Sequence, residues 1–303
     1  MIHLSPRRWA LAFFFALLLA AGLAFYLLRT PSSDQLLSFL PPSNRTTLYA
    51  DLSLLRRAGV LQKLAGQAGA EEPDYLKFVS ATAFDYRKDL DRLVLQFTPT
   101  QTHVIAAGRF QFDRLRAYAL ASGGRCSSDL CSLQGSAPDR QISWQPLARN
   151  ILGLSSGPDP LAATTLTRQS SRALFPIPQA ALWLYLPASE LHPREGLPPG
   201  ASAFLSALEG ASWALLSVEA GSDGKSYSLK LDAPAASREQ AGQIVARLSD
   251  ATQMLKRLLS REGHHPDPAD LSGILAAGNF WAESTTVRGQ WPIPPAFLDR
   301  LGR

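Results

Sequence analysis

Hydrophobic and polar positions along the chain follow strand and helix periods in a regular order. Runs or alternations of apolar residues predict strands at residues 48–52, 91–98, 103–110, 181–186, 212–220, 226–232 and 278–288, with shorter strands near 132–133, 141–145 and 150–155. Apolar residues three and four positions apart predict helices at residues 53–64, 112–121, 201–208 and 238–262. The order strand, helix, hairpin, helix, strand therefore occurs twice.

The helix at residues 238–262 has the clearest boundaries. Ser237 is followed three residues later by Gln240, which is the spacing of a capping box, and Gly263 stands at the far end. A helix of this length with one apolar stripe is expected to cover a sheet.

The repeated order is that of the ferredoxin-like fold, β-α-β-β-α-β. We therefore predict the α+β class, with two tandem ferredoxin-like units, each with its helices on one face of an antiparallel sheet. The first unit is expected at residues 41–165 and the second at residues 166–303.

Residues 9–28 form an uncharged apolar run that predicts a transmembrane helix. Twenty residues at 1.5 Å each span about 30 Å, which is the thickness of the hydrocarbon core. The alternative is a cleaved signal peptide, whose apolar core is shorter, and a cleavage signal at Ala20 would lie inside the run. Arg7 and Arg8 place the tail, residues 1–8, in the cytoplasm, so the body after a linker at residues 29–40 is expected outside it.

The composition refines this location. Arginine greatly outnumbers lysine, and the chain is rich in alanine, leucine and glycine. This composition suggests a GC-rich bacterial genome. The membrane is then expected to be the bacterial inner membrane, with the body of the protein in the periplasm. The net charge is +5, but residues 1–30 hold three arginines and no acidic residue. The rest is nearly neutral, which argues against nucleic acid as a partner.

Cys126 and Cys131 are the two cysteines of the chain. The four residues between them differ from the two-residue spacing of redox and zinc motifs. Outside the cytoplasm such a pair is expected to form a structural disulfide.

The segment from Gly153 to Gly157 matches G-x-S-x-G, the serine elbow of α/β-hydrolases. A hydrolase using Ser155 would need a helix that begins at Ser156 and a histidine within about 3.2 Å of the serine. Pro158 and Pro160 follow at once, so the interpretation of a strand that ends in a turn is favoured and the chain is not expected to be an enzyme.

The remaining polar clusters lack the spacing of a metal site. His264 and His265 lie near Asp267 and Asp270, but no third or fourth ligand is indicated. The acidic residues Asp85, Asp89 and Asp91 alternate with basic residues. Such a pattern is typical of surface side chains that neutralise one another at the start of a strand. His103 and His192 have no visible partner. No metal or cofactor is predicted.

Tryptophans offer a weaker indication of function. Trp281 and Trp291 lie beside a proline-rich segment and could face a partner, since aromatic residues are enriched at interfaces. Core packing is the alternative for both residues.

The segment from Thr82 to Arg92, with Phe84-Asp85-Tyr86 and Asp89-Leu90-Asp91-Arg92, resembles a group of uncharacterised bacterial proteins that carry an N-terminal anchor. The similarity extends over residues 40–161 and includes Gly108-Arg109-Phe110 before a helix. It implies a shared fold and location and no known activity.

These features predict a single-pass, membrane-anchored binding or scaffolding module of the cell envelope, with an envelope protein as an unidentified partner. The first alternative is a carrier of an apolar ligand, which requires a cavity of about 300 Å³ or more between the two units, lined by aromatic residues. The second is the hydrolase using Ser155.

Overall fold

The computed structural model describes residues 31–42, 44–65, 72–170, 174–193, 199–221, 226–261 and 265–301. The predicted anchor and the tail before it lie outside these residues. Within the described part of the chain, no helix is long and apolar enough to cross a membrane. From Ser33 onward the described residues belong to one compact unit.

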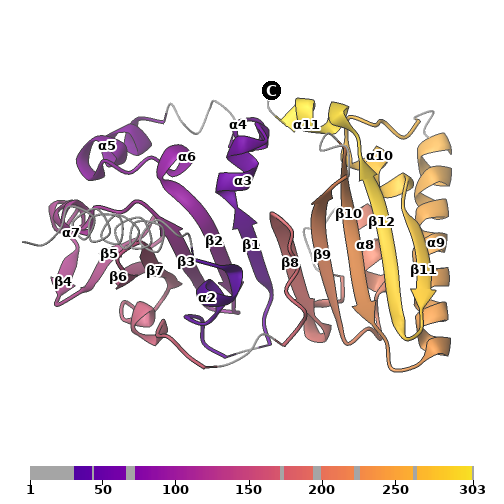
Figure 1. The fold of residues 1–303 in the computed structure, drawn as a ribbon, viewed down its shortest axis with the longest axis horizontal. Coiled ribbons are helices and arrows are strands. Elements are labelled where there is room, and N and C mark those ends of the chain that lie inside the picture. The colour runs from indigo at the N-terminus through magenta and orange to yellow at the C-terminus, as the bar shows by residue number, and fades with distance from the viewer. Residues whose placement is uncertain are drawn as a thin grey trace, which may run out of the picture. The chain divides into compact units, whose positions relative to one another are not determined.

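The protein has an α+β fold built on a twelve-stranded sheet, in which every described strand pair is antiparallel (Figure 1). Near its middle two strands are neighbours, β1 (Thr47–Asp51) and β8 (Leu182–Pro187), and they divide the sheet into parts of seven and five strands. Outward from β1 the sheet continues through β2 (Leu90–Phe97), β3 (Thr102–Gly108), β7 (Ile151–Gly157), β6 (Gln141–Ala148), β5 (Leu130–Gln134) and β4 (Arg125–Ser127). Outward from β8 it continues through β9 (Trp213–Ala220), β10 (Tyr227–Pro234), β12 (Thr286–Ile293) and β11 (Asn279–Glu283).

This strand order corrects the prediction of two ferredoxin-like units. In that fold the third strand lies between the first and the second. Here β2 pairs directly with β1, and β9 pairs directly with β8. Periodicity identifies strands but does not say which of them pair, so the order of elements alone could not separate these arrangements.

The predicted duplication nevertheless has a counterpart in the sheet. In each half a hairpin (β2–β3 or β9–β10) is followed by a helix, α7 (Phe112–Ala121) or α9 (Arg238–Arg261). The last strand of each half, β7 or β12, then pairs with the second strand of the hairpin. The two halves therefore extend in the same order, in opposite directions from the seam between β1 and β8.

One face of the sheet carries most of the helices. In the first half these are α3 (Leu52–Arg57), α4 (Val60–Ala65), α5 (Pro73–Thr82), α6 (Tyr86–Asp89) and α7. In the second half they are α8 (Pro199–Ala207), α9, α10 (Leu271–Ala276) and α11 (Pro295–Leu301), which also contacts α4. Ile244 and Leu248 of α9 are fully buried and belong to the same core as Leu231 of β10.

The opposite face of the first half is covered by two short segments. Helix α2 (Ser33–Leu37) contacts β2 and β3, and the 3-10 helix η2 (Ala162–Thr165) contacts β6 and β7. Residues 33–40 were predicted as linker. They fold onto the sheet because Leu36, Phe39 and Leu40, three and four positions apart, present one apolar stripe, and all three are buried.

The hairpins at the two ends of the sheet differ in how they are held. The predicted disulfide is confirmed, since Cys126 and Cys131 are bonded and lie opposite each other in β4 and β5. At the other end, the single strand predicted at residues 278–288 is a hairpin of β11 and β12. Ser284 has a positive φ of 56° in its turn, a conformation for which the sequence gives no glycine signal.

Candidate ligand-binding site

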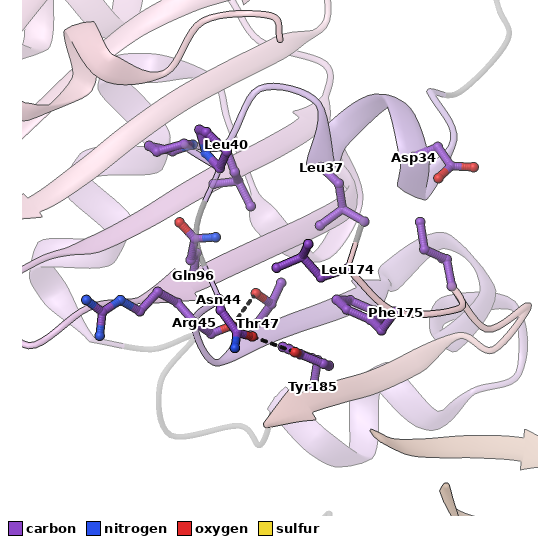
Figure 2. A pocket seen from close by; sticks show the side chains of 13 residues that line it. Asp34, Leu37, Leu40, Asn44, Arg45, Thr47, Gln96, Leu174, Phe175 and Tyr185 are labelled. Atoms are coloured by element: carbon purple, nitrogen blue, oxygen red, sulfur yellow. Dashed lines mark hydrogen bonds between the residues drawn. The ribbon is translucent and has the colours of Figure 1, made fainter. Parts of the chain in front are cut away.

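A cavity of about 850 Å³ lies beside the seam between the two halves of the sheet. Its walls come from α2 and the segment after it, from residues 174–177, and from strands β1, β2 and β8 (Figure 2). The lining residues are Asp34, Leu37, Leu40, Pro41, Pro42, Asn44, Arg45, Thr47, Gln96, Leu174, Phe175, Ile177 and Tyr185. The volume falls within the range of about 300–1,000 Å³ that is usual for ligand pockets.

Helix α2 places the first apolar wall. Asp34 lies in its first turn, where a carboxylate is favourable to the helix dipole. The consecutive prolines Pro41 and Pro42 follow Leu40 and cannot continue a helix. With Leu36 buried against the sheet, Leu37 and Leu40 are left to line the cavity.

Residues 174–177 form a second apolar wall. The ring of Phe175 stacks on Tyr185 at a centroid distance of 4.1 Å and meets Trp183 edge-on at 5.4 Å. Leu174 is 63% exposed although it is apolar. Figure 2 shows Leu37, Leu174 and Phe175 close together on one side, and Gln96 and Leu40 on the other.

Polar groups of the lining are mostly engaged with each other. The Tyr185 hydroxyl donates to Asn44 Oδ1 at 2.6 Å, and burial raises the pKa of Tyr185. Thr47 Oγ1 donates to the carbonyl of Arg45 at 3.0 Å. The Arg45 guanidinium makes no ion pair with any carboxylate in the described ranges.

A row of buried polar side chains crosses the sheet at the level of the cavity. Successive cross-strand partners along this row are Thr47, Gln96, His103, Ser155 and Ser143, from β1, β2, β3, β7 and β6. Each of them is at most 5% exposed. We call these five residues the polar row. Because buried polar groups are costly without hydrogen bonds, the partner of each member matters.

Most of the polar row is satisfied within the fold. Ser143 Oγ accepts the N–H of Ala163 at 3.0 Å. Gln145, two residues further along β6, donates to the carbonyls of Ala163 and Leu166 at 2.9 and 3.1 Å. These bonds hold η2 against the sheet, and the N–H of Gln169 donates to the carbonyl of Ser38 just after α2.

Gln96 is the exception in this row. Its side chain is buried, lines the cavity, and its Oε1 has no hydrogen-bond partner among the residues that the structure describes. A buried acceptor left without a donor costs about 1–3 kcal/mol. A ligand group that donated a hydrogen bond to this atom would remove that cost.

His103 and Ser155 form the centre of the polar row. The distance between His103 Nδ1 and Ser155 Oγ is 2.8 Å, so His103 does have a partner, contrary to expectation. Burial lowers the pKa of His103, which favours the neutral ring. This distance meets one requirement of the hydrolase alternative, but β7 continues through Ser156 to Gly157, so the required helix is not there.

The other predicted residues lie apart from the cavity. His264 is outside the described residues, and the described ones contain no cluster of three or more metal-ligating side chains. Asp85 caps α6 and accepts the hydroxyl of Tyr75 at 2.8 Å, whereas Asp89 and Asp91 pair with Arg109 and Arg56. These acidic residues are thus engaged in local ion pairs and a helix cap.

The two tryptophans differ in exposure. Trp281 is 42% exposed on the edge strand β11. Trp291 is buried and packs edge-on against Phe204 and Phe280, so its ring belongs to the core and is not available to a partner. Only Trp281 therefore keeps the predicted interface role open.

Sequence reasoning did not find Gln96, Arg45, Leu37 or Phe175. One signal was present, because a hairpin turn at residues 98–101 places Gln96 opposite His103 and so brings two polar side chains together on one face. The cavity itself depends on how residues 33–42 and 44–47 pack against residues 174–177, and contacts between such distant segments are not encoded by a local period.

The chain is thus an α+β protein with a long antiparallel sheet and a cavity beside its central strands. No known family model matches it, and no curated protein sequence does. Its fold is similar to that of TP0453, seen in two crystal forms. Crystal form I has a TM-score of 0.47 at 10% identity, with 89% of this chain and 98% of that chain covered. Crystal form III has a TM-score of 0.48 at 11% identity, with 89% and 96% covered. The likeness concerns the fold alone, and the resemblance to uncharacterised anchored proteins stays a prediction.

Proposed function

We propose that this chain is a membrane-anchored, extracytoplasmic binding module that holds an apolar ligand in the cavity beside β1 and β8. The observation that carries the proposal is the cavity itself, with a volume of about 850 Å³ and walls of leucine, isoleucine, proline and aromatic side chains. Transfer of apolar surface from water to such walls contributes about 25 cal/mol per Å².

The position of the cavity fits the carrier interpretation made from the sequence. Residues 34–47 and 96 belong to the first predicted unit or precede it, and residues 174–185 belong to the second. Helix α2, one wall of the cavity, follows the predicted anchor closely in the chain, which favours a ligand taken from the membrane. A role without catalysis is proposed, and scaffolding of an envelope protein stays a prediction.

Photoaffinity labelling in membranes tests this proposal with the full-length chain. The probe is hexadecane carrying a diazirine at mid-chain, and labelled peptides are identified by mass spectrometry. Leu37→Trp adds bulk inside the cavity and is compared with Leu120→Trp, which makes the same change at a half-exposed position of α7 away from the cavity.

We expect label on residues 34–47 and 174–185 of the natural chain and of Leu120→Trp, and at least a five-fold loss of that label in Leu37→Trp. Equal labelling of the two variants, or label confined to other parts of the chain, would show that the cavity is not the binding site.

A further inference from the structure

We propose that Gln96 recognises a hydroxyl group at the buried end of the ligand, so that the ligand is a long-chain molecule with an uncharged, hydroxyl-bearing terminus. This inference rests on the proposed function and goes further by assigning the chemical class of the ligand. It starts from the one member of the polar row whose acceptor is not satisfied.

The hydrogen-bonding inventory of this site selects a ligand group that can donate, and we take the hydroxyl as the simplest such group on a long-chain molecule. Gln96 Oε1 needs a donor, and in the described chain none is within reach. An ester or ketone oxygen accepts but does not donate. A hydroxyl both donates and accepts, so it can serve either the oxygen or the nitrogen of the amide.

The cross-strand neighbours of Gln96 argue against a charged group at this point, and Arg45, the cation of the lining, is not one of them. These neighbours are Thr47 and His103, and burial favours the uncharged form of His103. An anion placed there would lose its hydration without gaining a counter-charge from these neighbours. The Thr47 hydroxyl is already used in its bond to Arg45.

The rest of the cavity accommodates the hydrocarbon part. From Gln96 the lining continues with Leu40, which follows α2, and then with Leu37 of α2, Leu174 and Phe175, which lie close together (Figure 2). The ring of Phe175 is fixed by its stacking on Tyr185, which gives this wall a defined surface.

The test compares three diazirine probes of equal chain length on the full-length chain in membranes: the alkane, the primary alcohol and the sulfonate, which stays charged. Each is applied to the natural chain, to Gln96→Met and to Gln253→Met, the same substitution at an exposed position of α9. Gln96→Met removes the unpaired acceptor and keeps the length of the side chain, so it is expected to fold. Gln96→Asn, with a shortened amide, serves as a second variant.

We expect the ratio of alcohol to alkane label on residues 34–47 to fall about five-fold in Gln96→Met, which corresponds to one neutral hydrogen bond. The ratio should be unchanged in Gln253→Met and intermediate in Gln96→Asn. The sulfonate should show no dependence on Gln96.

Two results would overturn the inference. An alcohol-to-alkane ratio that is the same in all variants would mean that Gln96 contacts water or nothing, and a sulfonate that depends on Gln96 would contradict the uncharged terminus. In both cases normal alkane labelling of the cavity would leave the proposed function intact, whereas loss of alkane labelling from the natural chain would remove both.

Discussion

The two halves of the sheet have the same order of elements outward from the β1–β8 seam, yet they differ on the face opposite the main helices. In the first half α2 and η2 cover this face, and beneath them lie the polar row and the cavity. In the second half the same face carries the ion pairs Lys230–Glu219, Arg288–Asp232 and Arg288–Glu283, whose side chains are 30–69% exposed. The site therefore depends on short covering segments, not on the strand order that both halves share.

One ion pair in each half shows how strongly the two halves differ in burial on this face. Asp51 lies opposite Arg92 in β1 and β2, and Asp232 lies opposite Arg288 in β10 and β12. The side chain of Asp51 is 3% exposed, whereas that of Asp232 is 30% exposed. Burial alone would raise the pKa of Asp51, but hydrogen bonds from Ser53, from the Leu54 N–H and from Arg92 outweigh it and lower the pKa.

The largest expected effect comes from breaking these two pairs. Asp51→Asn removes a charge that is buried and accepts hydrogen bonds from Ser53, the Leu54 N–H and Arg92, so it should lower the free energy of unfolding by about 3 kcal/mol. Asp232→Asn should cost less than about 1 kcal/mol, because solvent screens this pair. Urea-dependent proteolysis of the full-length chain measures both values, and equal losses would contradict the contrast in burial.

The next effect concerns the end hairpins. Replacing both Cys126 and Cys131 by serine opens a short loop, which by chain-entropy arithmetic should cost about 2 kcal/mol. The loss should be seen as faster hydrogen exchange in β4 and β5, with β11 and β12 unchanged. An equal increase at both ends of the sheet would show that the disulfide acts globally.

A smaller effect is expected in the polar row. His103→Leu leaves Ser155 Oγ buried without its partner and should cost about 1.5 kcal/mol. The double substitution with Ser155→Ala should recover part of that loss, because both polar groups are then gone. Additive losses in a double-mutant cycle would mean that the 2.8 Å contact between His103 and Ser155 contributes no interaction free energy.

The smallest effect is a dependence on pH. The pKa of His103 is lowered in the folded state, so its contribution to stability is complete above the unfolded value near 6.5 and is lost as the pH falls through the folded pKa. Unfolding free energy should therefore decrease on acidification from pH 7.5, and less so in His103→Leu. The pKa of Asp51 is lowered as well, so Asp51 also loses its contribution to stability on acidification, but only near and below pH 3.8. An unchanged pH profile in the variant would assign the effect to other groups.

The sequence predicts local elements of this fold well. The helix expected at residues 238–262 is Arg238–Arg261, and Ser237 Oγ accepts the N–H of Gln240 at 3.1 Å, as the capping box requires. Such features depend on residues three or four positions apart. Strand pairing and the cavity depend on contacts between distant segments, such as Asn44 with Tyr185, which no local period encodes.

The candidate functional residues divide in the same way, into those set by residues close in sequence and those set by distant segments. The Cys126–Cys131 disulfide was predictable because the two residues are close in sequence. Gln96 was not, since a glutamine in an amphipathic strand resembles an exposed position until the covering segments are known.

Whether the cavity holds an apolar ligand is best measured by native mass spectrometry of the full-length chain released from its own membranes, with Leu37→Trp and Leu120→Trp prepared in parallel. We predict that the natural chain and Leu120→Trp retain a molecule with a hydrocarbon chain and a free hydroxyl, and that Leu37→Trp lacks it. The same bound molecules in all three proteins, or none in the natural chain, would contradict the claim that this cavity holds an apolar ligand.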